Sequence, residues 1–285
     1  MDEPPASPAP ELHLDRCLIP DRTELQEHTL VTDRMVLIGD HSRIDYGISG
    51  VEVVIAEFCR INGAVTAAGD IRIDNWTEVA GNVTTDADAY LGEGVRIAGR
   101  LSVTGDLDIG DNVQIEQGFE AHGWIQIRNP LPVLVYFMLY LMAMLRFERE
   151  DEVERFMAEV LGEDDGPIEQ PLVVPTGAVF DMERLEVPGV MAIGSYCRLH
   201  GNVRARTVEI GTATTLFGSV RASERVVIGP GTVVHGTVAS GGSIVVAPGA
   251  HVLGDLDGRM IEVHERALVD GTMRAPGGLR ITRDM

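Results

Sequence analysis

The sequence repeats itself every 17 to 18 residues, and this period restricts the possible folds more than any other feature. Aliphatic residues recur at this spacing in two series in the first half of the chain and in two more in the second half. The first-half series are Ile55, Ile73, Leu91 and Ile109, and Ile61, Val79, Ile97 and Ile115. The second-half series include Ile210, Ile228 and Val246, and Leu216, Val234 and Val252.

Glycines keep step with the aliphatic series, and the residues between them are typical of short β-strands. Such strands cannot stand alone, but three per circuit can wind into a β-solenoid whose coils pair with each other about 4.8 Å apart. The aliphatic series then form columns in the interior. The glycines mark corners that need a positive φ or a close approach between backbones. These corner glycines are Gly63, Gly81, Gly99, Gly201, Gly218, Gly236, Gly254 and Gly271.

The repeat divides the chain into two blocks with different segments before and between them. We predict an all-β fold, a parallel β-helix in two blocks of about five coils each, at residues 31–128 and 171–285. Residues 1–30 are acidic and rich in proline, which predicts a disordered tail. This tail lacks the basic and then apolar order of a signal peptide.

Residues 129–170 interrupt the repeat and are predicted to be helical, apolar first and acidic afterwards. The stretch forms one long helix, or two helices with a break near residues 146–149. The 15 uncharged residues of 131–145 are fewer than the roughly 20 that a membrane-spanning helix needs. A span, a helix lying in the membrane interface and a helix packed against protein therefore remain open alternatives. The residues that would make this contact are Leu134, Phe137, Leu141 and Leu145.

The charge of the chain is strongly negative and unevenly distributed. It has 44 acidic and 23 basic residues, a net charge of −21, and every basic residue is arginine. This balance favours a protein adapted to high salt, and it argues against nucleic acid as a partner. Residues 189–285 differ, with 10 arginines and 8 carboxylates, a net charge of +2. This asymmetry is consistent with contact between residues 189–285 and either an acidic surface of a neighbour or anionic lipid. Simple drift in composition would explain it as well.

No cluster of residues in the sequence predicts a catalytic, cofactor or metal site. Cys17, Cys59 and Cys197 are widely scattered, which argues for a reducing compartment such as the cytoplasm and against a disulfide framework or a zinc site. The stretch "GPGTVVHGTV" continues as strand, whereas a phosphate-binding loop would open a helix. His200 and His235 lie two coils apart, nearly 10 Å by the coil spacing, with Phe217 at the same phase between them. We expect these histidines to be exposed side chains.

A family resemblance rests on the second block, on the stretch from Arg204 to Leu256, "RARTVEIGTATTLFGSVRASERVVIGPGTVVHGTVASGGSIVVAPGAHVLGDL". Its cadence of a short aliphatic strand, a glycine, a few polar or small residues and another aliphatic residue resembles the bactofilins, polymer-forming cytoskeletal proteins. Given its acidity, the chain looks most like their haloarchaeal branch, the halofilins. The resemblance implies a right-handed β-helix that assembles end to end without bound nucleotide and supports cell shape.

The resemblance also implies the partners and the location of the chain, and it leaves an alternative. The partner is a second copy or a related bactofilin in the cytoplasm, at the inner face of the membrane if residues 131–147 contact it. The two blocks and the insertion depart from the one-domain plan of the family, so a partner, regulator or membrane tether of a simpler filament former is equally consistent. The alternative class is a trimeric solenoid enzyme, an acyltransferase of the hexapeptide-repeat type or a carbonic-anhydrase relative, because Ile193, Leu199 and Ala205 also scan as hexapeptides. We expect no enzyme activity.

Overall fold

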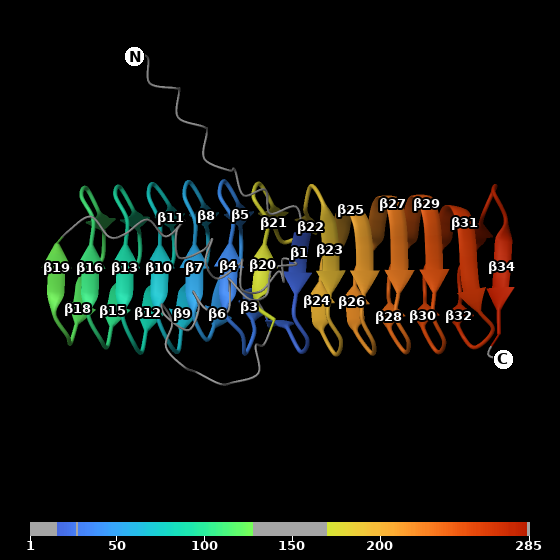
Figure 1. Cartoon of the computed structure of the whole chain (residues 1–285), viewed down its shortest axis with the longest axis horizontal. Coiled ribbons are helices and arrows are strands. Elements are labelled where there is room, and N and C mark those ends of the chain that lie inside the picture. Colours follow the sequence, from blue (N-terminus) through green and yellow to red (C-terminus); the bar gives the residue numbers. More distant parts are fainter. Residues whose placement is uncertain (1–15, 27, 128–169, 284–285) are drawn as a thin grey trace, which may run out of the picture.

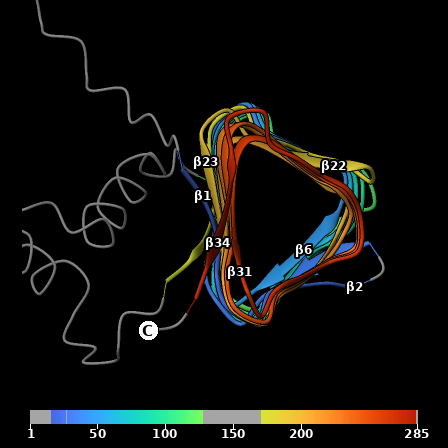
Figure 2. The ribbon, with the colours of Figure 1, turned by 90° about the vertical axis from the view of Figure 1, so that its right-hand side faces the viewer.

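The computed structural model describes residues 16–26, 28–127 and 170–283, which form a three-sided β-solenoid (Figures 1 and 2). All described elements are strands, in one sheet of 22 strands and one of 12. The smaller sheet contributes one strand to each coil, so the solenoid has about 12 coils. At the usual spacing between paired strands, the rod is roughly 55 Å long.

Each side of the rod is a stack of strands. In their order along the rod, the strands of the first side are β19 (Ile125–Ile127), β16 (Leu107–Ile109), β13 (Ala89–Leu91), β10 (Ile71–Ile73), β7 (Val53–Ile55), β4 (Val36–Ile38), β20 (Leu172–Val174), β1 (Arg16–Ile19), β23 (Val190–Ile193) and, at the far end, β34 (Leu279–Thr282). Between β23 and β34 lie the second halves of four long strands that span two sides, β25 (Asn202–Ile210), β27 (Val220–Ile228), β29 (Val238–Val246) and β31 (Leu256–His264).

The second and third sides are built in the same way. The second side holds β17 (Gln114–Ile115), β14 (Arg96–Ile97), β11 (Glu78–Val79), β8 (Arg60–Ile61), β5 (Arg43–Ile44), β21 (Val179–Phe180), β22 (Arg184–Glu186), the first halves of the long strands, and β33 (Met273–Arg274). The third side holds β18 (Phe119–Ala121), β15 (Leu101–Val103), β12 (Val83–Thr85), β9 (Val65–Ala67), β6 (Gly47–Gly50), β3 (Thr29–Val31), β2 (Glu24–Gln26), β24 (Arg198–His200), β26 (Thr215–Phe217), β28 (Val233–Val234), β30 (His251–Val252) and β32 (Leu268–Val269).

The direction of winding reverses at one level of the rod, which we call the junction. There the pairings on all three sides are antiparallel: β1 with β20, β2 with β3, and β21 with β22. The pairings next to the junction on either side are parallel. The chain therefore forms two arms. The first arm comprises residues 29–127 and 172–180, and the second arm comprises residues 16–26 and 184–282.

Both arms wind outward from the junction, which lies between β20 and β1 in the middle of Figure 1. The chain visits the sides in the order first, second, third in the first arm, and first, third, second in the second arm. Each end of the rod is consequently the last coil of an arm. The end of the first arm is formed by β17, β18 and β19, and the end of the second arm by β32, β33 and β34.

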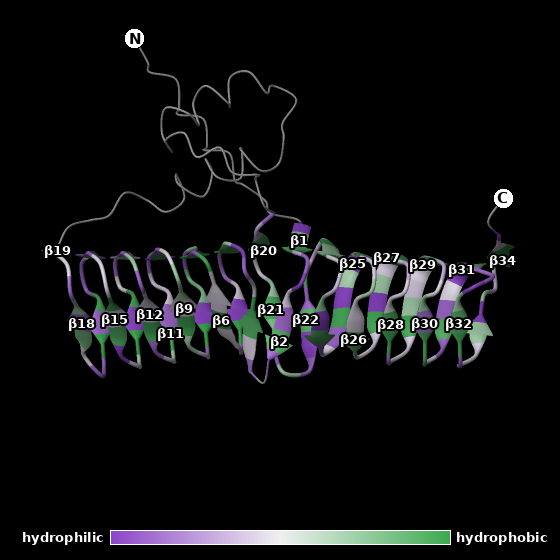
Figure 3. Ribbon diagram, turned by 90° about the horizontal axis from the view of Figure 1, so that it is seen from below, coloured by the Kyte–Doolittle hydropathy of each residue, from purple (hydrophilic) through white to green (hydrophobic). Residues whose placement is uncertain are grey.

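One hydrophobic core runs through both arms. Side chains alternate between the interior and solvent, as the hydropathy along the strands shows (Figure 3). Ile73 pairs in register with Ile55 and Leu91, one coil away in each direction, and Val234 pairs with Leu216 and Val252 in the same way. Of the four predicted columns, all residues are buried except Ile109 and Ile115, which are partly buried near the end of the first arm.

All the predicted corner glycines except Gly201 lie in close approach to the backbone of the preceding coil. A Cβ on Gly81 would lie 2.5 Å from the backbone of the preceding coil, at Gly63 and Ala64, so any larger residue would push the coils apart. Of the eight predicted corner glycines only Gly201 has a positive φ, of 114°. The left-handed residues instead occupy another corner, where Trp76 precedes Gly94 by one coil.

One predicted segment is contradicted by the structure, and another lies almost entirely outside the described residues. Residues 16–26 and 28–30 were expected to belong to a disordered tail, and this is wrong, because they form β1, β2 and most of β3. The strands are held by full burial of Cys17 and Ile19 in the core. The predicted helical insertion at 129–170, with Leu134, Phe137, Leu141 and Leu145, lies outside the described residues except for residue 170. In the described ranges, no helix is long and apolar enough to cross a membrane.

Candidate assembly interfaces at the rod ends

The first arm ends in three strands that are each paired on one edge. Among the described residues, β17, β18 and β19 pair only with β14, β15 and β16 of the preceding coil. These strands lie at one end of the rod, where Figure 1 labels β18 and β19. An unpaired strand edge offers N–H and C=O groups to another strand, so this end is a template for a further coil.

The apolar columns of the first arm continue into this last coil and are left open there. Phe119 is 48% exposed, whereas Leu101, its partner one coil inward, is fully buried. Ile125 is 49% exposed, and its inward partner Leu107 is 1% exposed. These positions are core positions by register, and no coil formed by the described residues covers them. The end of the first arm is therefore an apolar surface of the kind that marks an interaction site.

The second arm ends in the same way. Among the described residues, β32, β33 and β34 pair only with the preceding coil, through β30 and β31. Leu279 is 49% exposed and Met273 is 43% exposed, although their inward partners Ile261 and Leu256 are fully buried. Leu268 and Ile281 are also exposed. In the part of the chain that the structure describes, both ends thus combine unpaired strand edges with exposed residues of the apolar columns.

The two ends differ in charge. Residues 110–127, which we call the acidic end, contain Asp111, Glu116 and Glu120 and no arginine, a net charge of −3. Residues 265–283, which we call the basic end, contain four arginines and two carboxylates, a net charge of +2. Both carboxylates of the basic end have basic neighbours within the chain: Glu265 lies 2.9 Å from Arg283, and Asp270 lies 3.0 Å from His251.

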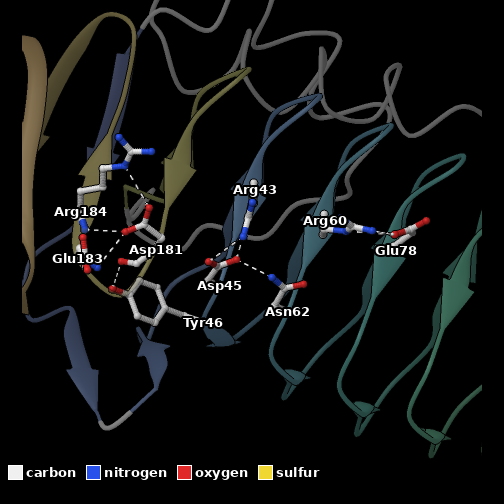
Figure 4. Close-up of polar contacts among 9 residues, drawn as sticks. All are labelled: Arg43, Asp45, Tyr46, Arg60, Asn62, Glu78, Asp181, Glu183 and Arg184. Atoms are coloured by element: carbon white, nitrogen blue, oxygen red, sulfur yellow. Dashed lines mark hydrogen bonds and ion pairs between the residues drawn. The ribbon is translucent and has the colours of Figure 1, made fainter.

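The junction shows how two coils of opposite direction are held together (Figure 4). The turn between β21 and β22 is capped by Asp181, whose Oδ1 accepts hydrogen bonds from the backbone N–H groups of Glu183 and Arg184, both at 2.9 Å. The Arg184 Nε lies 3.1 Å from Asp181 Oδ2. Tyr46 of the first arm donates its hydroxyl hydrogen bond to the Asp181 carbonyl.

The surroundings of Asp181 favour its charged form. Its partial desolvation alone would raise the pKa, but the two backbone N–H groups and the Arg184 guanidinium outweigh that effect and lower the pKa below its usual value. Within the second arm, next to the junction, Asp21 accepts a hydrogen bond of 2.6 Å from the Ser195 N–H of the neighbouring coil. Polar contacts thus hold the hairpin at Asp181, while the core passes through the junction.

The histidines and cysteines have structural surroundings. His200 and His235 are exposed and stack on the two faces of Phe217, at ring-centroid distances of 4.5 and 4.4 Å. Cys59 and Cys197 are buried, and burial raises the pKa of their thiols to about 12 and about 11. In the described part of the chain, no group of three or more histidine, cysteine, aspartate or glutamate residues is arranged to hold a metal ion.

Sequence reasoning missed the junction and the difference between the ends. The signal for the turn at the junction was present, since Asp181 follows β21 and precedes a short polar stretch typical of a capped turn. Comparisons of the chain with protein-family models, with curated proteins and with solved structures found no match.

Proposed function

We propose that this chain is a bactofilin-like scaffold protein, which assembles with itself or with a related solenoid through the ends of its rod and supports cell shape. The observation that carries the proposal is the pair of open ends. Each end presents three strand edges that no other described residue pairs with, over exposed residues of the core columns, including Phe119 and Leu279. The resemblance of residues 204–256 to the bactofilins supports the same class of function.

The physical argument is that a solenoid end left uncovered is unfavourable in water. Burying exposed apolar surface contributes roughly 25 cal/mol per Å², and a second chain that adds strands to the edge satisfies the backbone groups at the same time. The junction supports the feasibility of such a contact, because there two arms of this chain stack with antiparallel strands.

The finer features of the proposal come from the sequence. They are two blocks of right-handed winding, a helical insertion between them, a cytoplasmic location, and contact of residues 131–147 with the inner face of the membrane. Regulation or tethering of a simpler filament former belongs to the same class of function, since it uses the same ends.

The test is the state of the purified full chain across a concentration series in high salt. We expect species that lengthen as the concentration rises, followed by sedimentation velocity and seen as rods or filaments by electron microscopy. A chain that stays monomeric at every concentration, alone and with a related solenoid, would contradict the proposal. Compact trimers alone would contradict it as well and would favour the enzymatic alternative.

A further inference from the structure

Resting on the proposed self-assembly, we propose that the two ends of the rod bind each other, so that the acidic end of one copy docks on the basic end of the next. The partner of each end is therefore a second copy of this chain, held by the unlike end. This contact is heterologous, because two different surfaces meet in it.

The arrangement of the sides determines which strands meet. Each of the three sides runs the whole length of the rod. When two copies are aligned side to side, β19 meets β34 on the first side, β17 meets β33 on the second, and β18 meets β32 on the third. Ile125 then faces the strand of Leu279, and Phe119 faces the strand of Leu268. The exposed apolar residues of one end are thus placed against those of the other.

The strands that meet run antiparallel. Strand direction is kept within each arm and reverses at the junction, so β19 and β34 point in opposite directions along the first side. The junction itself stacks coils in this relation on all three sides. The contact between copies therefore repeats a kind of packing that the chain already contains.

Charge selects the unlike end over the like end. Two acidic ends in contact would bring Asp111 and Glu116 of both copies together, and two basic ends would do the same with Arg274 and Arg280. Within the described residues, none of these four side chains has an ion-pair partner. Arg274 lies on β33 and Glu116 directly follows β17, so the second side of the contact brings opposite charges together. Like charges across an interface are unfavourable and exclude the wrong pairing.

A contact of this kind does not close on itself. A heterologous interface between the two ends of a straight rod leaves one free end of each type at every stage, so it gives open polymers with a repeat of one rod. All copies in such a polymer point the same way, although each copy contains the reversal at its own junction.

The first experiment uses charge reversal at each end of the full chain, Glu116→Arg and Arg274→Glu. Each variant alone should need at least tenfold more protein to assemble than the unmodified chain, measured by sedimentation in moderate salt. An equimolar mixture of the two variants should assemble well, because arginine and glutamate again meet at every contact. The control Glu224→Arg, an exposed carboxylate in the middle of the second arm, should assemble like the unmodified chain.

The second experiment uses cross-linking to determine which two ends are in contact. Gln114→Cys places a thiol at the acidic end and Met273→Cys at the basic end, both at exposed positions, while the three native cysteines are buried. A short bismaleimide should link the two variants when they are mixed, and should link neither variant to itself. Self-linking within either variant would overturn the inference.

The outcomes separate this inference from the proposed function. If the unmodified chain does not assemble, the proposed function fails and the inference fails with it. If the unmodified chain assembles but both charge-reversed variants assemble equally well, only the inference is overturned. Assembly of Glu116→Arg with the unmodified chain that exceeds that of the unmodified chain alone would show contacts between acidic ends, which also overturns it.

Discussion

At the scale of single residues, small hydrogen-bonding side chains hold one corner in each arm, between the first and second sides in the first arm and between the first and third sides in the second arm. Thr77 Oγ1 donates to the Ala56 carbonyl at 2.8 Å, and Thr232 Oγ1 donates to the Gly211 carbonyl at 2.6 Å. Cys59 occupies the corner of Thr77 in the first arm and Cys197 the corner of Thr232 in the second arm, with their sulfurs 3.2 and 3.1 Å from backbone carbonyls. These thiols therefore replace hydroxyl groups in a structural role.

The aliphatic columns could be predicted from the sequence because a fixed period with β-branched residues allows few alternatives. The role of the cysteines was also within reach, since Cys59 lies 18 residues before Thr77 and Cys197 lies 17 before Thr214. It was missed because cysteines were compared with metal and disulfide spacings and not with the period of the chain.

A buried carboxylate offers a test at this scale. Asp74 is 4% exposed, and burial, with smaller contributions from the Glu57 and Asp40 carboxylates, raises its pKa to about 6, although the Asn75 N–H partly opposes the shift. The raised pKa means that folding favours the protonated form. The contribution of Asp74 to stability is therefore full below about pH 4 and is lost as the pH rises through about 6.

We expect Asp74→Asn to raise the free energy of unfolding by about 1–3 kcal/mol at pH 7.5 and to change it little at pH 4. Asparagine keeps an oxygen that can accept the Asn75 hydrogen bond without a buried charge. Denaturant unfolding of both proteins at the two pH values measures the difference, with Asp86→Asn as an exposed control. An equal effect at both pH values would contradict the assignment.

At the scale of elements, the two hairpins at the junction determine the architecture. The hairpin β2–β3 carries the chain from the second arm into the first, and the hairpin β21–β22 carries it back. The sequence could not show this reversal, because a coil wound in either direction has the same period and the same alternation. The hairpin β2–β3 was hidden further by the acidic, proline-rich residues that precede it, which suggested a continuous disordered tail.

Asp181 tests the importance of the second hairpin. We expect Asp181→Ala to lower the free energy of unfolding by about 1–2 kcal/mol at neutral pH, because two backbone N–H groups and the Arg184 guanidinium lose their acceptor. Since the pKa of Asp181 is lowered by folding, its contribution is present above about pH 4 and disappears as the pH falls through the lower folded value.

The control for this measurement is Glu183→Ala. Glu183 is exposed in the same turn and takes part through its backbone N–H alone, which the substitution preserves. Thermal unfolding of the two variants at pH 7 and pH 3 should show a clear loss for Asp181→Ala at pH 7 and a smaller loss at pH 3. Equal losses in the two variants would show that the carboxylate does not cap the turn.

At the scale of the whole molecule, the reversal places the first strand of the chain in the middle of the rod. β1 lies at the junction, whereas β34 lies at the basic end (Figure 1). The sequence predicted a β-solenoid, but not that residues 172–180 join the first arm and residues 16–26 the second. Nothing in a local repeat specifies which edge of a block faces its neighbour.

This placement predicts opposite effects of two fusions. A folded domain that replaces residues 1–15 joins the rod at the junction and should leave assembly unchanged, because both ends stay open. The same domain attached after Arg283 lies beside β34 and should block the basic end, limiting assembly to short species. Sedimentation of the two fusions measures this, and a C-terminal fusion that forms polymers of normal length would contradict the proposed use of the ends.

Because of the reversal, the two arms can fold at different times during synthesis of the chain. In residues 29–127 of the first arm, each coil pairs with residues about 18 positions away, so this part can wind while the chain is being synthesised. The pairing of β1 with β23 and the hydrogen bond from Ser195 to Asp21, 174 residues apart, must wait until most of the chain has been made. A first arm that has just formed therefore exposes a strand edge at both of its ends, and only the late return of the chain to the junction covers one of them.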